Sequence, residues 1–221
     1  MIALNCPNCG AEIVFSTPAL PVKVCDHCRT IVVRRGQSAE NVGTVAELPF
    51  DVSPLKIGTR GEWAGEGFEI VGRVRWSWED GAWNEWFLTL QGGGTRWLGE
   101  AMGQLMVTEE RSPDDVDPIL ELLAQGKDIV IGQEALIYGV RYRLVDQRTA
   151  RCVSSEGELP FTAPTGWTVF SADFRSGQGD FASLQRDGRE CRLYVGRCVD
   201  LAELKPDNLR ILPGWEAPTY G

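Results

Sequence analysis

Two closely spaced cysteine pairs near the start of the chain place the strongest constraint on its fold. Cys6 and Cys9 enclose two residues, as do Cys25 and Cys28, and fifteen residues separate the pairs. Two thiolates at this spacing can bind one ion from a tight turn, and two such turns facing each other complete a tetrahedral four-sulfur zinc site. Four cysteine ligands leave no open position for water or substrate, so the sequence predicts a structural Zn²⁺ rather than a catalytic one.

Short strand-like segments surround these pairs, at residues 12–15, 22–24 and 30–33. With the cysteines, they resemble the zinc ribbon family over roughly residues 4–35, and we expect such a ribbon at 1–35. The alternative is a pair of disulfides or a redox CxxC motif. It is disfavoured because a cytosolic chain keeps its thiols reduced and neither pair opens a thioredoxin-like unit. His27, the single histidine, lies inside the second pair and is expected to be exposed rather than a ligand.

The charge balance argues against nucleic acid as a partner. The net charge is −9; residues 1–40 hold four basic and three acidic side chains, so the rest of the chain carries −10. Phosphate binding depends on clustered Lys and Arg, which the sequence lacks outside the ribbon. The sequence also has no run of eighteen apolar residues and no signal-like start. We therefore expect a cytoplasmic protein without a transmembrane segment, which reaches a membrane only through its partners.

Strand signals dominate residues 55–205 and predict a mainly β protein, with a β-barrel or sandwich-like domain after the ribbon. The segment GFEIVGRVRWSW (67–78) alternates between apolar and polar residues. This alternation predicts one face made of Phe68, Ile70, Val74, Trp76 and Trp78. Residues 36–54 are small and polar and are predicted to be a linker.

Two short helices and a C-terminal tail complete the predicted elements. Asp117 as N-cap, Pro118 at the first position and Gly126 as the stop predict a helix at 117–125. A second helix is expected at 201–205, ending at Pro206. Residues 206–221 are irregular, and their apolar side chains predict a tail that docks on the β domain.

A weak internal repeat suggests that the β domain contains two related halves, 55–111 and 127–205, joined through the 117–125 helix. Residues 56–72 match the segment 128–146, pairing Gly58 with Gly132 and Ile70 with Leu144. A second match pairs FLTLQGGG (87–94) with FASLQRDG (181–188). Two such units could close one shared core. The alternative is chance similarity between β-hairpins.

Several motifs make the β domain resemble an uncharacterised bacterial family, the domain of unknown function 4178, over roughly residues 55–200. They are VGRVRW (71–76), WNEWFL (83–88) and RWLGEAMG (96–103). The matching positions are Trp83, Glu85, Trp86, Trp97, Leu98, Glu100 and Gly103. The resemblance implies a frequent N-terminal zinc ribbon and an accessory role near membranes, because the family's genes tend to lie beside envelope-stress and polyamine-synthesis genes. It implies no activity and therefore no catalytic residue.

A cluster of tryptophans supplies the candidate binding surface. Four of the eight tryptophans lie within eleven positions, at Trp76, Trp78, Trp83 and Trp86. Alternation along the second strand puts Trp83 and Glu85 on one side and Trp86 on the other. A ring face beside a carboxylate suits a cationic ligand. The candidate surface comprises Trp83, Glu85, Trp86, Trp97 and Glu100. The alternative is core packing, with Trp76, Trp78 and Trp86 filling the interior and Trp83 capping a loop.

Three function classes follow from these features. The first is a non-enzymatic interaction or adaptor protein, accessory to a membrane or envelope-stress system, whose ribbon and Trp/Glu surface each meet a protein partner. The second is a binder of a small cationic, polyamine-like ligand. The third is an enzyme using Glu85 and Glu100, which we disfavour because the one histidine lies in the ribbon and no nucleotide-binding glycine motif occurs.

Overall fold

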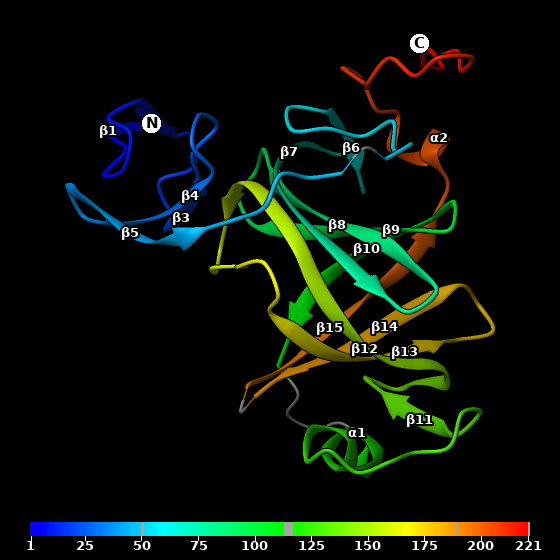
Figure 1. Cartoon of the computed structure of the whole chain (residues 1–221). Coiled ribbons are helices and arrows are strands. Elements are labelled where there is room, and N and C mark those ends of the chain that lie inside the picture. Colours follow the sequence, from blue (N-terminus) through cyan, green and yellow to red (C-terminus); the bar gives the residue numbers. More distant parts are fainter. Residues whose placement is uncertain (50, 113–116, 189, 221) are drawn as a thin grey trace.

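The computed structural model describes residues 1–49, 51–112, 117–188 and 190–220, and these form a mainly β protein with two short helices (Figure 1). The N-terminal ribbon comprises β1 (Ile2–Asn5), β2 (Glu12–Phe15), β3 (Val22–Val24), β4 (Thr30–Arg35) and β5 (Ser38–Thr44). The residues predicted to be a linker therefore include a strand. β5 pairs antiparallel with β4 and extends the ribbon sheet beyond residue 35, because the turn at Gly36 leads the chain straight back along β4.

Within its described residues, the β domain contains ten strands and both helices. The first half has β6 (Arg60–Trp63), β7 (Glu66–Trp78), β8 (Gly81–Leu90), β9 (Thr95–Ala101), β10 (Gln104–Arg111) and then α1 (Pro118–Ala124). The second half has β11 (Glu134–Ile137), β12 (Val140–Leu159), β13 (Thr168–Arg175), β14 (Asp180–Asp187), β15 (Glu190–Val199) and then α2 (Leu201–Leu204). The predicted helices are thus both present, and Asp117 caps α1 by accepting a hydrogen bond from the Ile119 N–H at 3.0 Å.

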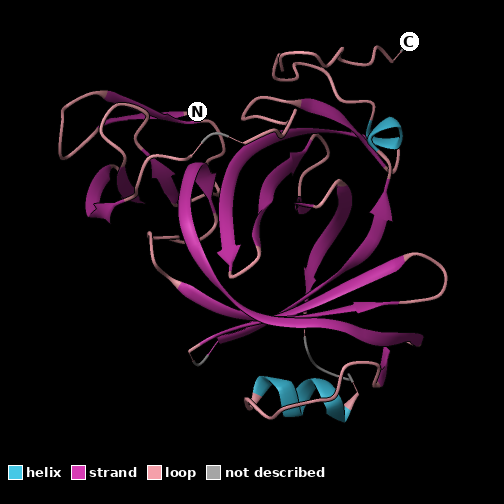
Figure 2. Ribbon diagram, turned by 45° about the vertical axis from the view of Figure 1, so that its right-hand side comes forward, coloured by secondary structure: helices cyan, strands magenta, loops and turns pink. Residues whose placement is uncertain are grey.

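Eight of these strands close into an antiparallel, barrel-like ring. The hydrogen-bonded order runs β7-β8-β9-β10-β15-β14-β13-β12, and β12 pairs back with β7. Figure 2 shows the curved strands enclosing a central space. The short strands β6 and β11 lie beside the ring, where each forms a tight hairpin with the long strand that follows it.

The two halves repeat both their element order and their local hydrogen bonds. The Gly58 N–H donates to the Ile70 carbonyl at 2.8 Å, and the Gly132 N–H donates to the Leu144 carbonyl at 2.8 Å. Both long strands then shift register at the next residue, Val71 in β7 and Val145 in β12. The repeat inferred from 56–72 and 128–146 therefore has a structural counterpart. The match of 87–94 with 181–188 does not, because element order makes β13, not β14, the counterpart of β8.

The register shift in β7 explains why the predicted single apolar face is wrong. A β-bulge adds one residue to a strand and so reverses the alternation of side chains beyond it. Phe68 and Ile70, before the bulge, pack outside the ring with Trp86, whereas Val74 and Trp76, after it, pack inside.

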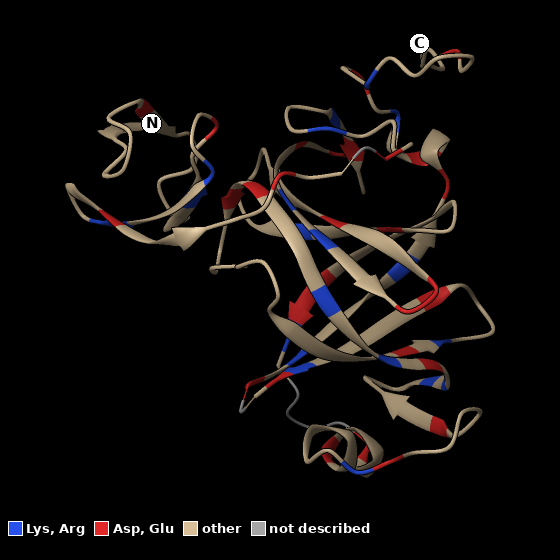
Figure 3. Cartoon of the chain, in the orientation of Figure 1, with Lys and Arg blue, Asp and Glu red and all other residues tan. Residues whose placement is uncertain are grey.

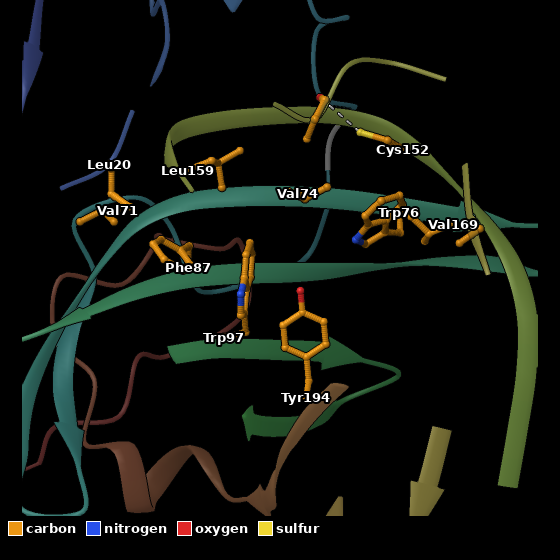
Figure 4. Packing of buried hydrophobic residues seen from close by; sticks show 12 residues of the cluster. Leu20, Val71, Val74, Trp76, Phe87, Trp97, Cys152, Leu159, Val169 and Tyr194 are labelled. Atoms are coloured by element: carbon orange, nitrogen blue, oxygen red, sulfur yellow. Dashed lines mark hydrogen bonds between the residues drawn. The ribbon is translucent and has the colours of Figure 1, made fainter. Parts of the chain in front are cut away.

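The core is divided by the wall of the ring. One inner cluster, which includes Trp76, Phe87, Trp97 and Tyr194, fills one end of the interior (Figure 4). An outer cluster around Trp86 and Leu204 covers the first half, next to α2, and another around Leu123 and Phe174 covers the second half, next to α1. Each half therefore packs on its outer surface the helix that follows the other half in the chain, while the two halves share the interior.

The ribbon and the tail both contact the β domain. Lys23 and Val22 of β3 pair with Glu158 and Leu159 at the end of β12, and Leu20 joins the inner cluster. In the tail, Asp207 donates a backbone hydrogen bond to Arg60 and Leu209 packs on the outer core, whereas Ile211 is 94% exposed. No helix in the described part of the chain is long and apolar enough to span a membrane.

Candidate functional site

Four cysteine thiols converge between two tight turns of the ribbon. The sulfur atoms of Cys6, Cys9, Cys25 and Cys28 all lie within 4.8 Å of one another. The Sγ atoms of Cys6 and Cys28 are 3.6 Å apart and those of Cys9 and Cys25 are 3.8 Å apart. A tetrahedral ion with sulfur ligands at about 2.3 Å requires sulfur–sulfur separations of about 3.8 Å, so this cluster can hold a metal ion.

The two cysteine turns share one backbone pattern. The Gly10 N–H donates to the Cys6 carbonyl at 2.9 Å, and the Arg29 N–H donates to the Cys25 carbonyl at 2.9 Å. Both donors have positive φ, 78° at Gly10 and 60° at Arg29. The Thr30 side chain lies 3.1 Å from the Cys28 sulfur, and hydrogen bonds from Thr30 and Asn8 lower the pKa of Cys28 to about 5. His27 is exposed, as predicted.

A second candidate site lies inside the ring. A cavity of about 320 Å³ is lined by side chains from all eight ring strands. Its aromatic walls come from Trp78, Trp83, Trp97, Phe181 and Tyr194. The exposed side chain of Met102, in the turn between β9 and β10, marks its open end. Trp97 and Tyr194 of the inner cluster form part of its wall.

Glu85 of β8 projects into this cavity and is held by three donors. The indole N–H groups of Trp76 and Trp83 donate to its carboxylate at 2.8 and 3.2 Å, and the Gln185 side-chain amide donates at 2.8 Å. Burial raises the pKa of Glu85, although these three hydrogen bonds lower it. Its remaining exposed surface faces the cavity. Glu85 is therefore a fixed polar group in the cavity wall, with both oxygens already partnered.

Asp173 of β13 supplies a second carboxylate with one oxygen still available. Its Oδ1 accepts hydrogen bonds from the hydroxyls of Ser183 and Ser171 at 2.7 and 3.2 Å. Its Oδ2 has no hydrogen-bond donor among the residues that the structure describes. Burial raises the pKa of Asp173, and the neighbouring charge of Asp146 raises it further. The carboxyl of Asp173 is thus open to a ligand, whereas that of Glu85 is not.

Two arginines also line the cavity, and they differ in whether a carboxylate pairs with them. Arg148 forms an ion pair with Asp146 and stacks over the Trp78 ring, 4.3 Å from its centroid. Arg175 donates to the Gln104 side-chain oxygen at 2.6 Å and to the Cys198 sulfur at 3.0 Å, neither of which belongs to a carboxylate. The cavity therefore combines aromatic surface with separate acidic and basic positions.

The model of one protein family matches residues 56–201, the part of the chain that forms this ring. This chain belongs to the family described as domain of unknown function DUF4178. No curated protein and no solved structure matches the chain. The four-cysteine cluster lies N-terminal to the DUF4178 domain, and the cavity lies within it.

The structure separates the five residues of the predicted binding surface. Trp83, Glu85 and Trp97 line the cavity of the DUF4178 domain. Trp86 is fully buried in the outer core, and Glu100 accepts hydrogen bonds there from the Trp86 indole N–H and the Asn84 amide, both at 3.0 Å. Because Glu85 and Glu100 project to opposite sides of the sheet, they cannot act on one substrate as a carboxylate pair.

Sequence reasoning missed the contribution of the second half of the DUF4178 domain to the cavity. Ser171, Asp173 and Arg175 occupy alternate positions of β13, and Ser183 lies opposite Asp173 on β14. Their alternation with Ala172 and Phe174 was visible in the sequence. It reads as an ordinary solvent-facing side, because only ring closure turns this polar side inward.

Proposed function

We propose that the DUF4178 domain is a non-enzymatic binding protein for a small organic ligand that carries a positively charged group. One observation supports this most directly. The ring encloses a cavity in which aromatic side chains surround an inward-facing carboxyl, that of Asp173, with one oxygen available. This form of binding requires no catalytic step.

The dimensions of the cavity fit a small ligand. Pockets for small molecules range from about 300 to 1,000 Å³, so a cavity of about 320 Å³ suits a compact molecule rather than a peptide. The wall combines apolar and aromatic side chains with polar and charged groups, which can fix the orientation of a bound molecule.

Charge and aromatic surface together favour a cation. Indole rings attract cations over their faces by about 0.5–2 kcal/mol, and Trp78 and Trp83 lie 5.5 Å apart between ring centroids in the cavity wall. A hydrogen bond between an ammonium group and a carboxylate is about twice as strong as one between neutral groups. Burial raises the pKa of Asp173 because it disfavours the charged carboxylate, and a bound cation would stabilise that charged form.

The proposal can be tested by titrating the full-length, zinc-loaded chain with 1,6-diaminohexane and spermidine and following tryptophan fluorescence and calorimetric heat. We expect saturable binding that Asp173→Asn weakens at least about tenfold, since a hydrogen bond to a charged group contributes about 1.5–3 kcal/mol. Asp180→Asn is the matched control, because Asp180 lies on the adjacent strand outside the cavity wall and should leave affinity unchanged. Flat titrations at millimolar amine would overturn the proposal.

We also propose that the ribbon cysteines bind one structural zinc ion. The four sulfur atoms have the separations that tetrahedral zinc requires, and no donor position is left for substrate. Purified protein should contain about one zinc per chain by elemental analysis, and Cys9→Ser should remove it. Retention of full zinc content by Cys9→Ser would contradict the assignment.

An adaptor role in the cytoplasm is a second candidate, supported by an exposed edge strand of the ribbon. β5 is the outermost strand of the ribbon sheet, and its side chains are mostly exposed. An edge strand of this kind can pair with a strand from another protein. Cross-linking in the native host, comparing the full chain with a variant lacking residues 37–44, would test this role. Unchanged cross-linked partners would remove β5 from consideration.

A further inference from the structure

We infer that the cavity of the DUF4178 domain selects a zwitterionic ligand, whose cationic group meets Asp173 and whose anionic group meets Arg175. This inference rests on the proposed function and adds an anion-binding position to the cation-binding one. The ligand class is a small molecule with an amine at one end and a carboxylate at the other, rather than a diamine or polyamine.

Arg175 lacks an acidic partner among the described residues. Its hydrogen bonds go to the Gln104 side-chain oxygen and the Cys198 sulfur, and its guanidinium lies over the Phe181 ring, 5.7 Å from the centroid. Its cross-strand neighbours are Arg143 on β12 and Phe181 on β14, and neither supplies a carboxylate. Arg143 itself pairs with Glu134, at 3.5 Å. No carboxylate of the described residues neutralises the Arg175 guanidinium, so it can pair with an anionic group that enters the cavity.

The other basic group in the wall does not offer this position. Arg148 is paired with Asp146 while its guanidinium lies over Trp78, so its charge is already neutralised by a carboxylate. With this pair neutralised and the oxygens of Glu85 partnered, two ionisable groups remain open to a ligand, Asp173 and Arg175. In their ionised forms they have opposite signs.

The positions of these two residues define a direction for the ligand. Side chains two residues apart on a strand project to the same side, about 6–7 Å apart along it. Ser171, Asp173 and Arg175 follow one another along the inner side of β13. Arg175 contacts Gln104, close to the Met102 turn at the mouth, so the anionic end of the ligand lies at the mouth and the cationic end lies deeper.

A diamine fits these two positions poorly. Its second ammonium would lie beside the Arg175 guanidinium, and like charges that close together repel each other strongly in a partly enclosed site. A carboxylate in the same place can form the forked pair of hydrogen bonds for which a guanidinium is shaped, replacing the Gln104 side chain as acceptor.

The experiment compares three probes of equal chain length on the full-length, zinc-loaded protein: 6-aminohexanoate, 1,6-diaminohexane and hexanoate. Calorimetric titration should give the highest affinity for 6-aminohexanoate, about tenfold or more above the diamine, because one end group changes from repelled to paired. Arg175→Gln should abolish this preference without abolishing amine binding, and Arg175→Lys should retain part of it. Arg197→Gln, on the outer side of β15 where Arg197 pairs with Glu203, is the control and should keep the full preference.

The outcomes separate this inference from the proposed function. If the diamine binds as tightly as 6-aminohexanoate, or if Arg175→Gln keeps the preference, Arg175 does not bind the anionic end of the ligand, while a cation site at Asp173 stands. If hexanoate binds and neither amine does, both proposals fail. If none of the three binds at millimolar concentration, the zwitterion inference is likewise overturned.

Discussion

The two cysteine turns of the ribbon differ at the single residue that must adopt a left-handed backbone. Gly10 serves the first turn with φ 78°, and Arg29 serves the second with φ 60°. A left-handed conformation costs a residue with a side chain roughly 1–2 kcal/mol, whereas glycine adopts it freely. The second turn therefore carries strain that the first does not.

Replacing Arg29 by glycine should stabilise the ribbon. Relief of the left-handed strain is partly offset by the greater freedom of glycine in the unfolded chain, which leaves a gain of roughly 0.5–1 kcal/mol. The measurement is chemical denaturation of the zinc-loaded protein followed by hydrogen exchange at the ribbon amides. Gly10→Ala is the reverse substitution, made in the first turn as a control. It should destabilise the ribbon because alanine must adopt the left-handed backbone, although its methyl group would meet nothing within 4 Å. A loss of stability in Arg29→Gly would show that the side chain, not the backbone, dominates this position.

At the scale of elements, the sequence predicted the strands, turns and helices well, but it did not predict which side of each strand the closed ring covers. Cysteine spacing located the two cysteine turns, capping residues located α1, and alternation assigned the two sides of β8 correctly. The bulge at Val71 was not predictable, because it inserts one residue into the pattern without any unusual residue type. The polar side of β13 was equally misleading, since alternation shows which residues share a side but not whether ring closure covers that side.

Close strand crossings in the ring depend on particular glycines. A Cβ at Gly72 in β7 would lie 2.0 Å from the Glu158 carbonyl oxygen of β12, a backbone atom that cannot move aside easily. We expect Gly72→Ala to cost about 3 kcal/mol or more, because β7 and β12 would have to separate where they close the ring. Thermal and urea unfolding would measure the loss.

Gly99→Ala in β9 provides the comparison for Gly72→Ala. Its nearest neighbour would be the flexible Met106 methyl group at 3.2 Å, so the cost should be about 1 kcal/mol or less. Equal losses for the two variants would mean that contact with the β12 backbone does not set the tolerance of the ring.

At the scale of the whole molecule, a buried carboxylate, that of Glu158, lies at the contact between the ribbon and the ring. Glu158 accepts hydrogen bonds from the backbone N–H groups of Ser16 and Thr17 at 2.7 and 2.9 Å and lies 3.7 Å from the Lys23 ammonium. Replacing it with glutamine turns one acceptor into a donor that faces other donors. Glu158→Gln should therefore weaken docking by about 2–3 kcal/mol.

Hydrogen exchange would measure this change through loss of protection at the amides of Ser16 and Thr17. Zinc content should stay at that of the wild type, because the cysteine turns are separate from this contact. Unchanged protection would mean that strand pairing between β3 and β12, rather than Glu158, carries the attachment.

The enclosed carboxyls should also set how the stability of the whole domain depends on pH. Burial raises the pKa of both Asp173 and Glu85, so the folded protein keeps their protons at pH values where the unfolded chain has released them. Folded protein then binds more protons than unfolded protein, and the free energy of unfolding falls as pH rises from about 4 towards the raised pKa values. Each group contributes a slope of up to about 1.4 kcal/mol per pH unit in this window.

Asp173→Asn isolates this effect, because asparagine cannot ionise and its amide oxygen can still accept from Ser171 and Ser183. The stability of the variant relative to the wild type should rise in urea unfolding as pH increases above about 4, the pKa of an Asp in the unfolded chain, while the ribbon contributes equally to both proteins and cancels. A saturating ligand amine should reduce the difference by stabilising the ionised Asp173 of the wild type alone. Parallel pH profiles for the two proteins, with or without amine, would mean that Asp173 is already ionised in the empty cavity, and its carboxylate would then attract a cation without having to release a proton first.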